Sequence, residues 1–246
     1  MLKRIKKTLT LNSSRIYLAQ FAQRAAASLS NDARVLDAGA GDCPYRSYFS
    51  HAHYESTDLC HVEKNYSCIS YICDLKNIPI KSDCYDLVFC SQTLEHVPEP
   101  KEVVEELFRV LKPNGQLWLT APLFFAEHEI PFDYYRYTRY GLKYLIQDAG
   151  YKVESIEWLE GYFGTLAYQL REAAKALPIK PKEYRLGIFG ILIVFFIGGL
   201  KILFAALTVF FTWLDIRSKY VARGQCKNFA VIAKKATPSD KGLSFL

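Results

Sequence analysis

The sequence predicts an α/β fold in which a doubly wound, mostly parallel sheet of seven strands carries helices on both faces, with an apolar helical insert between strands six and seven. Three observations indicate this fold. Short apolar runs alternate with segments of helical periodicity, several of these runs end in an acidic or hydroxyl residue, and a glycine turn follows the first run. The chain has 246 residues, of which 50% are apolar, so it is long enough for one large α/β domain with an appendage.

The first predicted strand and its turn lie between Val35 and Arg46, in the sequence V-L-D-A-G-A-G-D-C-P-Y-R. Gly39 and Gly41 lack the Cβ that would hold a ligand away from the backbone, so this turn can press its N–H groups against a cofactor. Pro44 suits the first turn of a helix, which we expect to follow. A two-glycine turn is also an ordinary connection in α/β proteins, so this motif alone does not identify a ligand.

The segment before this strand, residues 1–29, has apolar residues at roughly helical spacing with basic residues between them. It predicts an amphipathic helical segment that packs on the sheet or lies on an anionic membrane surface. Four basic residues near the start resemble the beginning of a signal peptide, but polar residues at 12–15 interrupt the apolar run that would have to follow. We therefore expect no export.

Six further strands are predicted at 53–58, 70–73, 85–90, 116–121, 151–159 and 228–234. The first four strands are closed by Asp37, Asp58, Asp74 and Ser91. In an open parallel sheet, such strand ends line one crevice where ligands bind. Asp58 lies 17 positions after Gly41, close to the spacing at which an acid binds the hydroxyls of a ribose.

Two helices are predicted between the later strands. The first covers 99–111 and ends at a turn of sequence K-P-N-G. The second is capped by Thr138, runs to about Ala149 and is closed by Gly150.

The predicted insert contains Gly187 to Leu214, a stretch whose only charge is Lys201. About twenty apolar residues suffice to cross a bilayer, but strands six and seven must pair in one sheet, so the insert has to leave and return on the same side. We therefore expect a helical hairpin, bent near Gly198–Gly199, that enters one leaflet without crossing it. Basic residues flank it on both sides, as expected for an anionic cytoplasmic face. The alternative is a dimerisation or core helix pair.

The composition gives 31 basic and 25 acidic residues, a net charge of +6. The basic residues flank apolar segments and form no extended basic face around the predicted crevice, so we expect no nucleic-acid partner. The seven cysteines form no C-x-x-C pair, which favours reduced thiols in a cytoplasmic protein. His51, His53, Cys60 and His61 lack the paired spacing of structural metal sites, and we predict no metal.

Five pieces of sequence occur in a characteristic order. They are L-D-A-G-A-G (36–41), Asp58, D-L-K-N-I-P-I-K-S-D-C-Y-D-L-V (74–88), E-H-V (95–97) and L-K-P-N-G-Q-L (111–117). Together they resemble the class I S-adenosylmethionine-dependent methyltransferases, of the type 11 group. The resemblance covers about residues 30–160 and departs where the third glycine of the first motif is Cys43 followed by Pro44. That proline also argues against the G-x-G-x-x-G motif of nicotinamide cofactors.

The sequence as a whole predicts an amphipathic helical segment at 1–29, a cofactor-binding core at 30–160 that carries the resemblance, an apolar, membrane-associating insert at 161–225 and a last core strand with its tail at 226–246. The resemblance implies that S-adenosylmethionine is bound by Asp37, Ala38, Gly39, Gly41, Asp58, Leu59, Asp74, Leu75, Ser91, Gln92 and His96. Asp37 with the two glycines would surround the methionine portion, and Asp58 would hold the ribose. Residues 74–75 would border the adenine, and residues 91–92 would lie under the sulfonium, whose positive charge favours nearby oxygen atoms.

The acceptor side is predicted in the aromatic segment 121–138. His128 is the candidate base for an oxygen nucleophile, because its ordinary pKa is near neutrality, with Asp133 and Arg136 as further candidate catalytic residues. His128 as a hydrogen-bonded loop residue, and the arginine as a surface charge, remain open alternatives. The segment resembles a stretch in methyltransferases of bacterial surface-polysaccharide and lipid-linked glycan gene clusters.

The sequence thus predicts a methyltransferase attached peripherally or monotopically to the cytoplasmic membrane face, with a small-molecule, glycan or lipid-linked acceptor. Oligomerisation through the apolar insert is left open. The alternative is a non-catalytic protein of the same fold that acts as a membrane-bound assembly partner.

Overall fold

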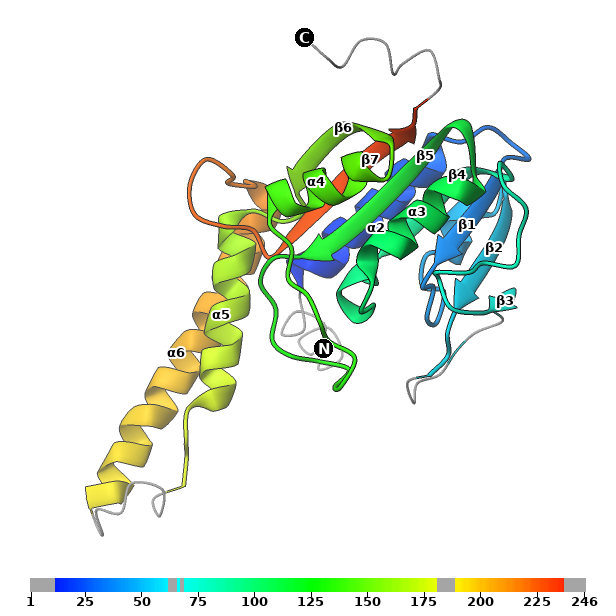
Figure 1. Cartoon of the computed structure of the whole chain (residues 1–246). Coiled ribbons are helices and arrows are strands. Elements are labelled where there is room, and N and C mark those ends of the chain that lie inside the picture. The colour runs from blue at the N-terminus through cyan, green and yellow to red at the C-terminus, as the bar shows by residue number, and fades with distance from the viewer. Residues whose placement is uncertain (1–11, 62–65, 67–68, 181–188, 237–246) are drawn as a thin grey trace. The chain divides into compact units, whose positions relative to one another are not determined.

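The computed structural model describes residues 12–61, 66, 69–180 and 189–236, and the start of the predicted N-terminal segment lies outside these ranges (Figure 1). The chain divides into two compact units. The sheet unit comprises Leu18–Leu159 and Asn228–Leu246, and the hairpin unit comprises Met1–Tyr17 and Glu160–Lys227.

The sheet unit is built on seven strands, namely β1 (Arg34–Ala38), β2 (His53–Asp58), β3 (Tyr71–Ile72), β4 (Tyr85–Ser91), β5 (Leu111–Pro122), β6 (Tyr151–Trp158) and β7 (Asn228–Lys235). Their order across the sheet is β3-β2-β1-β4-β5-β7-β6. The pairs from β3 to β5 are parallel, whereas β7 runs antiparallel to both β5 and β6. The predicted fold class is confirmed, with one reversed strand in an otherwise parallel sheet.

Helices cover both faces of this sheet, with α2 (Ser13–Ala27) on one face and α3 (Pro100–Val110) and α4 (Arg139–Asp148) on the other (Figure 1). Phe21 of α2 packs on Phe89 and Trp118, with ring centroids 6.2 and 4.9 Å apart. On α3 the buried side chains follow helical spacing at Val103, Leu107 and Val110. As predicted, Thr138 caps α4 by accepting a hydrogen bond from Gly141 N. The buried core therefore lies between the sheet and these helices.

Two local elements differ from the prediction. The helix expected after Pro44 is only a 3₁₀ turn, η1 (Arg46–Phe49), because β2 begins at His53 and leaves no room for a longer helix. The K-P-N-G turn expected after the third helix is absorbed into β5, which starts at Leu111 directly after α3. Tyr85 pairs with Leu111 and Leu87 pairs with Gln116, so the four residues between bulge out of the sheet.

The hairpin unit pairs α5 (Tyr162–Ala176) with α6 (Phe189–Arg217). The expected bend near Gly198–Gly199 is wrong, because α6 continues through both glycines as one helix of 29 residues. Neither glycine has a neighbouring atom within 4 Å of an added Cβ, so nothing packs there to force a break. The hairpin is instead formed by α6 and the preceding helix α5.

The polarity of α6 is inverted relative to a helix on the surface of a water-soluble domain. Its outward face carries apolar side chains, among them Phe189, Leu192, Phe195, Phe196, Ile202, Leu203, Phe210 and Trp213. Its polar side chains Thr208, Thr212 and Asp215 are buried, and Lys201 Nζ donates to the carbonyl of Leu177. A helix in water normally presents the opposite arrangement.

Asp215 fixes α6 to the start of α5. Its two carboxylate oxygens lie so close to Gly161 and Gly164 that a Cβ at either glycine would come within 2.4 Å of one of them. A carboxylate at a helix N-terminus is favoured by the backbone dipoles. Burial nevertheless raises the pKa of Asp215, while the Gly164 backbone and Ser13 hydrogen bonds lower it. Tyr17 OH donates to the Asp215 carbonyl at 2.7 Å, which adds the start of α2 to this junction.

Candidate cofactor and acceptor site

The turn after β1 depends on its first glycine. Gly39 has φ +76°, and a Cβ at this position would lie 2.2 Å from Thr93 Cγ2. The N–H groups of Gly39 and Ala40 both donate to the carbonyl of Thr57, at 2.8 and 3.1 Å. A side chain here would therefore push the turn away from β4 and β2.

Asp58 lies at the end of β2 beside this turn. Its Oδ2 accepts a hydrogen bond from Gly41 N and its Oδ1 accepts one from Cys60 N, each at 2.9 Å. Each carboxylate oxygen has two acceptor positions, so Asp58 can support the turn and still accept hydrogen bonds from a ligand diol.

A cavity of about 350 Å³ opens at this edge of the sheet. Seven residues predicted to bind the cofactor border it, namely Gly39, Asp58, Leu59, Asp74, Leu75, Gln92 and His96. The remaining wall comes from His61, Tyr66, Lys76, Thr93, Val97, Pro98, Glu99, Glu129, Phe132 and Tyr134. The ends of β1, β2 and β4 thus meet at one cavity.

Four other predicted cofactor residues, Asp37, Ala38, Gly41 and Ser91, are not among the residues that line the cavity. Asp37 is buried and accepts a hydrogen bond of 2.5 Å from Tyr54 OH. Burial raises the pKa of Asp37 to about 7, and the hydrogen bond from Tyr54 opposes this rise. Ser91 shares a hydrogen bond with Thr120, at 2.9 Å. Their predicted roles at the cofactor stay predictions.

The three predicted catalytic residues lie together in the loop after β5. Arg136 holds Asp133 through two hydrogen bonds of 2.7 Å, and it also donates to the carbonyls of Phe125 and Ala126. This ion pair and the His128 N–H hold the pKa of Asp133 well below its usual range. The geometry makes Asp133 and Arg136 a brace for the loop, and a direct role at the acceptor stays a prediction.

His128 packs against His96, with ring centroids 4.6 Å apart and nearly perpendicular rings. Of the two, His96 borders the cavity. The Nδ1 of His96 lies 2.6 Å from the carbonyl of Phe132, which fixes the proton on Nδ1 and leaves the Nε2 lone pair available. Burial lowers the pKa of His96, so its neutral form is favoured. His128, the base predicted from the sequence, therefore contacts His96 and does not itself line the cavity.

Sequence analysis missed Glu129, Phe132 and Tyr134 as cavity residues. They lie in the aromatic segment already assigned to the acceptor side, but nothing in their spacing distinguishes them from the neighbouring residues. Two hydrogen bonds to the Glu95 carbonyl, from the N–H groups of Tyr134 and Tyr135, hold this segment against the end of β4. Such a long-range contact has no local sequence signal.

Residues 36–119 match the protein family described as “Methyltransferase domain”. Among curated proteins, a ubiquinone biosynthesis O-methyltransferase from Coxiella burnetii is 30% identical over 86 residues, which are 35% of this chain and 34% of that protein. One from Pseudomonas savastanoi is 44% identical over 37 residues, 15% of this chain and 16% of that protein. The chain therefore spans about a third or less of these curated relatives.

Among solved structures, a 1,6-didemethyltoxoflavin N1-methyltransferase from Burkholderia thailandensis with bound S-adenosylhomocysteine has a TM-score of 0.52 at 14% identity, over 88% of this chain and 79% of that one. A Haemonchus contortus phosphoethanolamine N-methyltransferase in complex with S-adenosylmethionine has a TM-score of 0.53 at 15% identity, over 87% and 52%. These similarities concern the fold.

The strand order with one reversed strand, the glycine turn and the matched segment define a class I methyltransferase fold. Residues 36–119 of the chain match a methyltransferase domain, the domain predicted from the sequence. The solved structures show the same fold over most of the chain.

Proposed function

We propose that this chain binds S-adenosylmethionine in the cavity at the ends of β1, β2 and β4 and transfers its methyl group to an amphipathic or lipid-linked acceptor at a membrane surface. The observation that carries the first part is the cavity itself, which joins the Gly39 turn and Asp58 in a methyltransferase domain. Its volume of about 350 Å³ is within the range of small-molecule sites.

The polar groups on the cavity wall fit the chemical groups of this cofactor. Asp58 supplies carboxylate oxygens for a ribose diol, and Asp74 with Leu75 supplies a polar and an apolar wall for an adenine. Gln92 offers an amide beside Thr93 for the charged end. When bound, S-adenosylmethionine supplies a methyl group activated by a sulfonium.

The wall formed by Glu129, Phe132 and Tyr134 would face the acceptor. Methyl transfer requires alignment of the nucleophile with the methyl group, which an aromatic wall supports by restricting the acceptor. An oxygen nucleophile must also lose its proton. The imidazole of His96 and the carboxylate of Glu129 border the cavity and are candidate proton acceptors.

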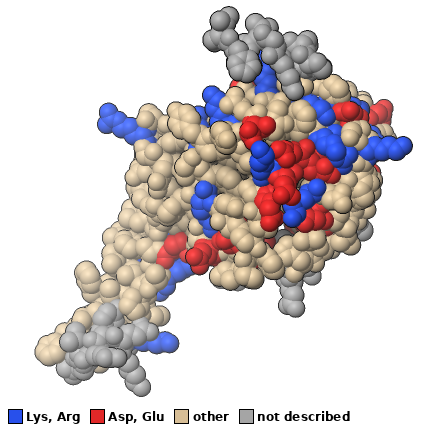
Figure 2. Space-filling view, viewed as in Figure 1, with Lys and Arg blue, Asp and Glu red and all other residues tan. Residues whose placement is uncertain are grey.

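The hairpin supports the membrane part of the proposal. Its helix α6 is long and apolar enough to cross a membrane, and only 6% of its most apolar window is buried. A core helix of a water-soluble protein would be mostly buried. In the view of Figure 2 the side of the hairpin formed by α6 consists mostly of uncharged residues.

The second helix of the hairpin has a different character. Near its end α5 carries Arg171, Glu172 and Lys175. The pair therefore has one apolar side and one polar side, the arrangement of an amphipathic element that lies in a membrane interface. Arg217 at the end of α6 and Lys219 just after it are basic and would favour an anionic surface. We therefore place the chain on the membrane as a monotopic protein.

Calorimetry with S-adenosylhomocysteine tests the cofactor site. The wild-type chain should bind it, and Asp58→Ala should lower the affinity by about tenfold or more, because a hydrogen bond to a charged group contributes roughly 1.5–3 kcal/mol. Asp148→Ala, which removes an exposed carboxylate on α4, is the matched control and should bind normally. Absence of binding by the wild-type chain would favour a non-catalytic assembly partner instead.

The acceptor is sought by mass spectrometry of membrane lipids and glycans from cells with and without the gene. A species that gains the mass of one CH₂ only when the gene is present identifies the acceptor class. Gain of this mass only on water-soluble metabolites would contradict a lipid-linked acceptor.

A further inference from the structure

Glu95 is a buried carboxylate whose oxygens have no hydrogen-bond partner among the described residues. It lies in the 3₁₀ turn η2 (Leu94–His96) after β4, and its exposed fraction is 1%. Burial of a polar group without a partner costs free energy, so a carboxylate retained in this position indicates a ligand that it binds.

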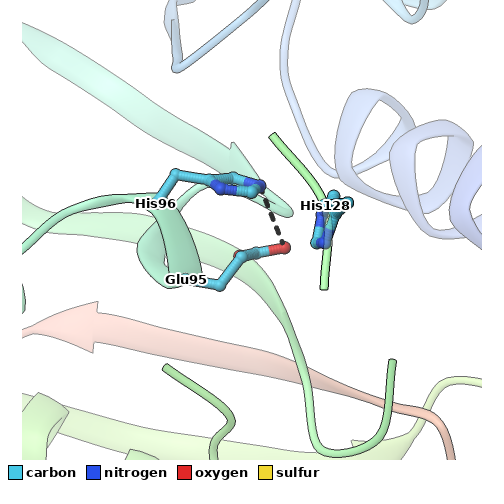
Figure 3. A group of neighbouring side chains, drawn as sticks. All are labelled: Glu95, His96 and His128. Carbon is cyan, nitrogen blue, oxygen red and sulfur yellow. Dashed lines mark ion pairs between the residues drawn. The ribbon is translucent and has the colours of Figure 1, made fainter. Parts of the chain in front are cut away.

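Two imidazoles face this carboxylate. Figure 3 shows that the side chains of Glu95, His96 and His128 converge, the first two from η2 and the third from the loop after β5. His96 Nε2 lies 3.9 Å from Glu95 Oε1, and the potential ligand atoms of all three residues lie within 4.8 Å of one another.

The second nitrogen of each imidazole is occupied by the protein. His96 Nδ1 lies 2.6 Å from the carbonyl of Phe132. His128 Nδ1 lies 3.2 Å from the carbonyl of Ala126 and 3.5 Å from Asp133 Oδ2. Histidines that bind metals generally donate their other ring N–H to a carbonyl or a carboxylate, which orients the ring and fixes its tautomer. Both imidazoles therefore have the hydrogen bonds of metal ligands.

We propose that Glu95, His96 and His128 bind a divalent transition-metal ion of the zinc class. Two imidazole nitrogens and one carboxylate oxygen favour such an ion over Mg²⁺ or Ca²⁺, which prefer oxygen ligands. Ligand atoms bonded tetrahedrally at roughly 2 Å lie about 3.3 Å apart, so these three atoms need to approach one another by at most about 1.5 Å.

Three protein ligands leave one coordination position open, as in catalytic zinc sites. His96 borders the cavity, so that position is available to an acceptor oxygen. This role rests on the proposed function. An oxygen bound to the ion is more acidic, and with His96 on the metal, Glu129 remains as the proton acceptor.

The test uses the full-length, untagged chain, stripped with a chelator, reloaded with Zn²⁺ or Co²⁺ and analysed by elemental mass spectrometry and visible absorption. The wild type should retain about one ion, and the Co²⁺ form should show the absorption bands of a cobalt ion bound by nitrogen and oxygen. Glu95→Gln keeps the shape of the side chain and removes its charge, and His128→Ala changes a partly exposed loop residue. Each should weaken metal binding by at least ~10-fold.

His53→Ala is the matched control, because His53 is an exposed imidazole at the start of β2, and it should bind the ion like the wild type. Circular dichroism establishes that the variants are folded. The proposal is overturned if the reloaded wild type holds no ion, or if Glu95→Gln and His128→Ala both hold it as tightly as the wild type does. S-adenosylhomocysteine binding by the same samples separates this outcome from failure of the cofactor site.

Discussion

The apolar face of α6 gives a quantitative prediction for membrane binding. Phe195 and Phe196 are 76% and 72% exposed, so about three quarters of each side chain is available to enter a lipid phase. Transfer of a whole Phe side chain out of water contributes roughly 2 kcal/mol, so the pair contributes about 3 kcal/mol. Replacing both by Asp should therefore lower partitioning into vesicles by about 150-fold.

The assay is sedimentation of the full chain with vesicles of phosphatidylethanolamine and phosphatidylglycerol. Tyr140→Asp with Tyr144→Asp is the matched control, because these side chains on α4 are 77% and 73% exposed and should not contribute. Equal losses for the two pairs, or a loss of less than ~3-fold for the Phe pair, would refute the reasoning. A wild-type chain that stays soluble and monomeric without detergent would also refute the reasoning. A stable soluble dimer would indicate that a second copy of the chain covers the apolar face.

Three further predictions concern stability. Because burial raises the folded-state pKa of Asp37 to about 7, this group destabilises the fold progressively as pH rises from about 4 to 7. Asp37→Asn should therefore be more stable than the wild type in denaturant unfolding by about 4 kcal/mol at pH 7, and this margin should vanish near pH 4. Gly164→Ala should lower the melting temperature of the hairpin, because its Cβ would lie 2.4 Å from Asp215 Oδ2. Gly198→Ala should raise the melting temperature slightly, because its Cβ would have no neighbour within 4 Å and alanine favours a helix. Equal shifts for the two variants would contradict this packing. A lysine at position 136 cannot make both hydrogen bonds that Arg136 makes to Asp133. Arg136→Lys should therefore speed cleavage of the loop after β5 in limited proteolysis. An unchanged cleavage rate would show that this ion pair does not hold the loop in place.

The first four strands of the sheet unit were predictable because each is a short segment that ends in or is followed by an acidic or hydroxyl residue. The run at 53–58 coincides with β2, and that at 228–234 falls one residue short of β7. The helix after Pro44 was not predictable from its cap, because the distance to the next strand decides its length. The turn predicted at K-P-N-G was wrong for a similar reason. Strand pairing on both sides of these residues makes them a bulge within β5.

The cofactor side of the site was more predictable than the acceptor side. Asp58 and Gly39 lie at fixed places relative to strand ends, so sequence spacing locates them in the fold. The approach of His128 to His96 depends instead on a loop folding back across the end of β4, and 32 positions of sequence separate the two residues. Residue type alone therefore favoured His128 as the base, although His96 borders the cavity and His128 does not.

The hairpin shows a further limit of hydropathy. The apolar stretch located the insert, but the glycine pair suggested a bend that the backbone does not make. Glycine permits a bend without requiring one, and α6 continues as a helix through both glycines and packs against α5. The polarity of the inner face, with Thr208, Thr212 and Asp215 buried, emerges only once the partner helix is known.

The reversed strand β7 has a consequence for how such an insert can be accommodated. Since β5 and β6 both run antiparallel to β7, β6 ends at the same edge of the sheet as β1, β2 and β4. The Leu159 N–H donates to the Asn228 carbonyl at 2.9 Å, so the two stems of the insert are joined side by side at that edge. The fold can thus accept a long excursion there without disturbing strand pairing. If the insert attaches to a membrane as proposed, its two stems would tether the sheet unit to the surface that holds the acceptor, and tethering raises the effective concentration of an acceptor confined to that surface.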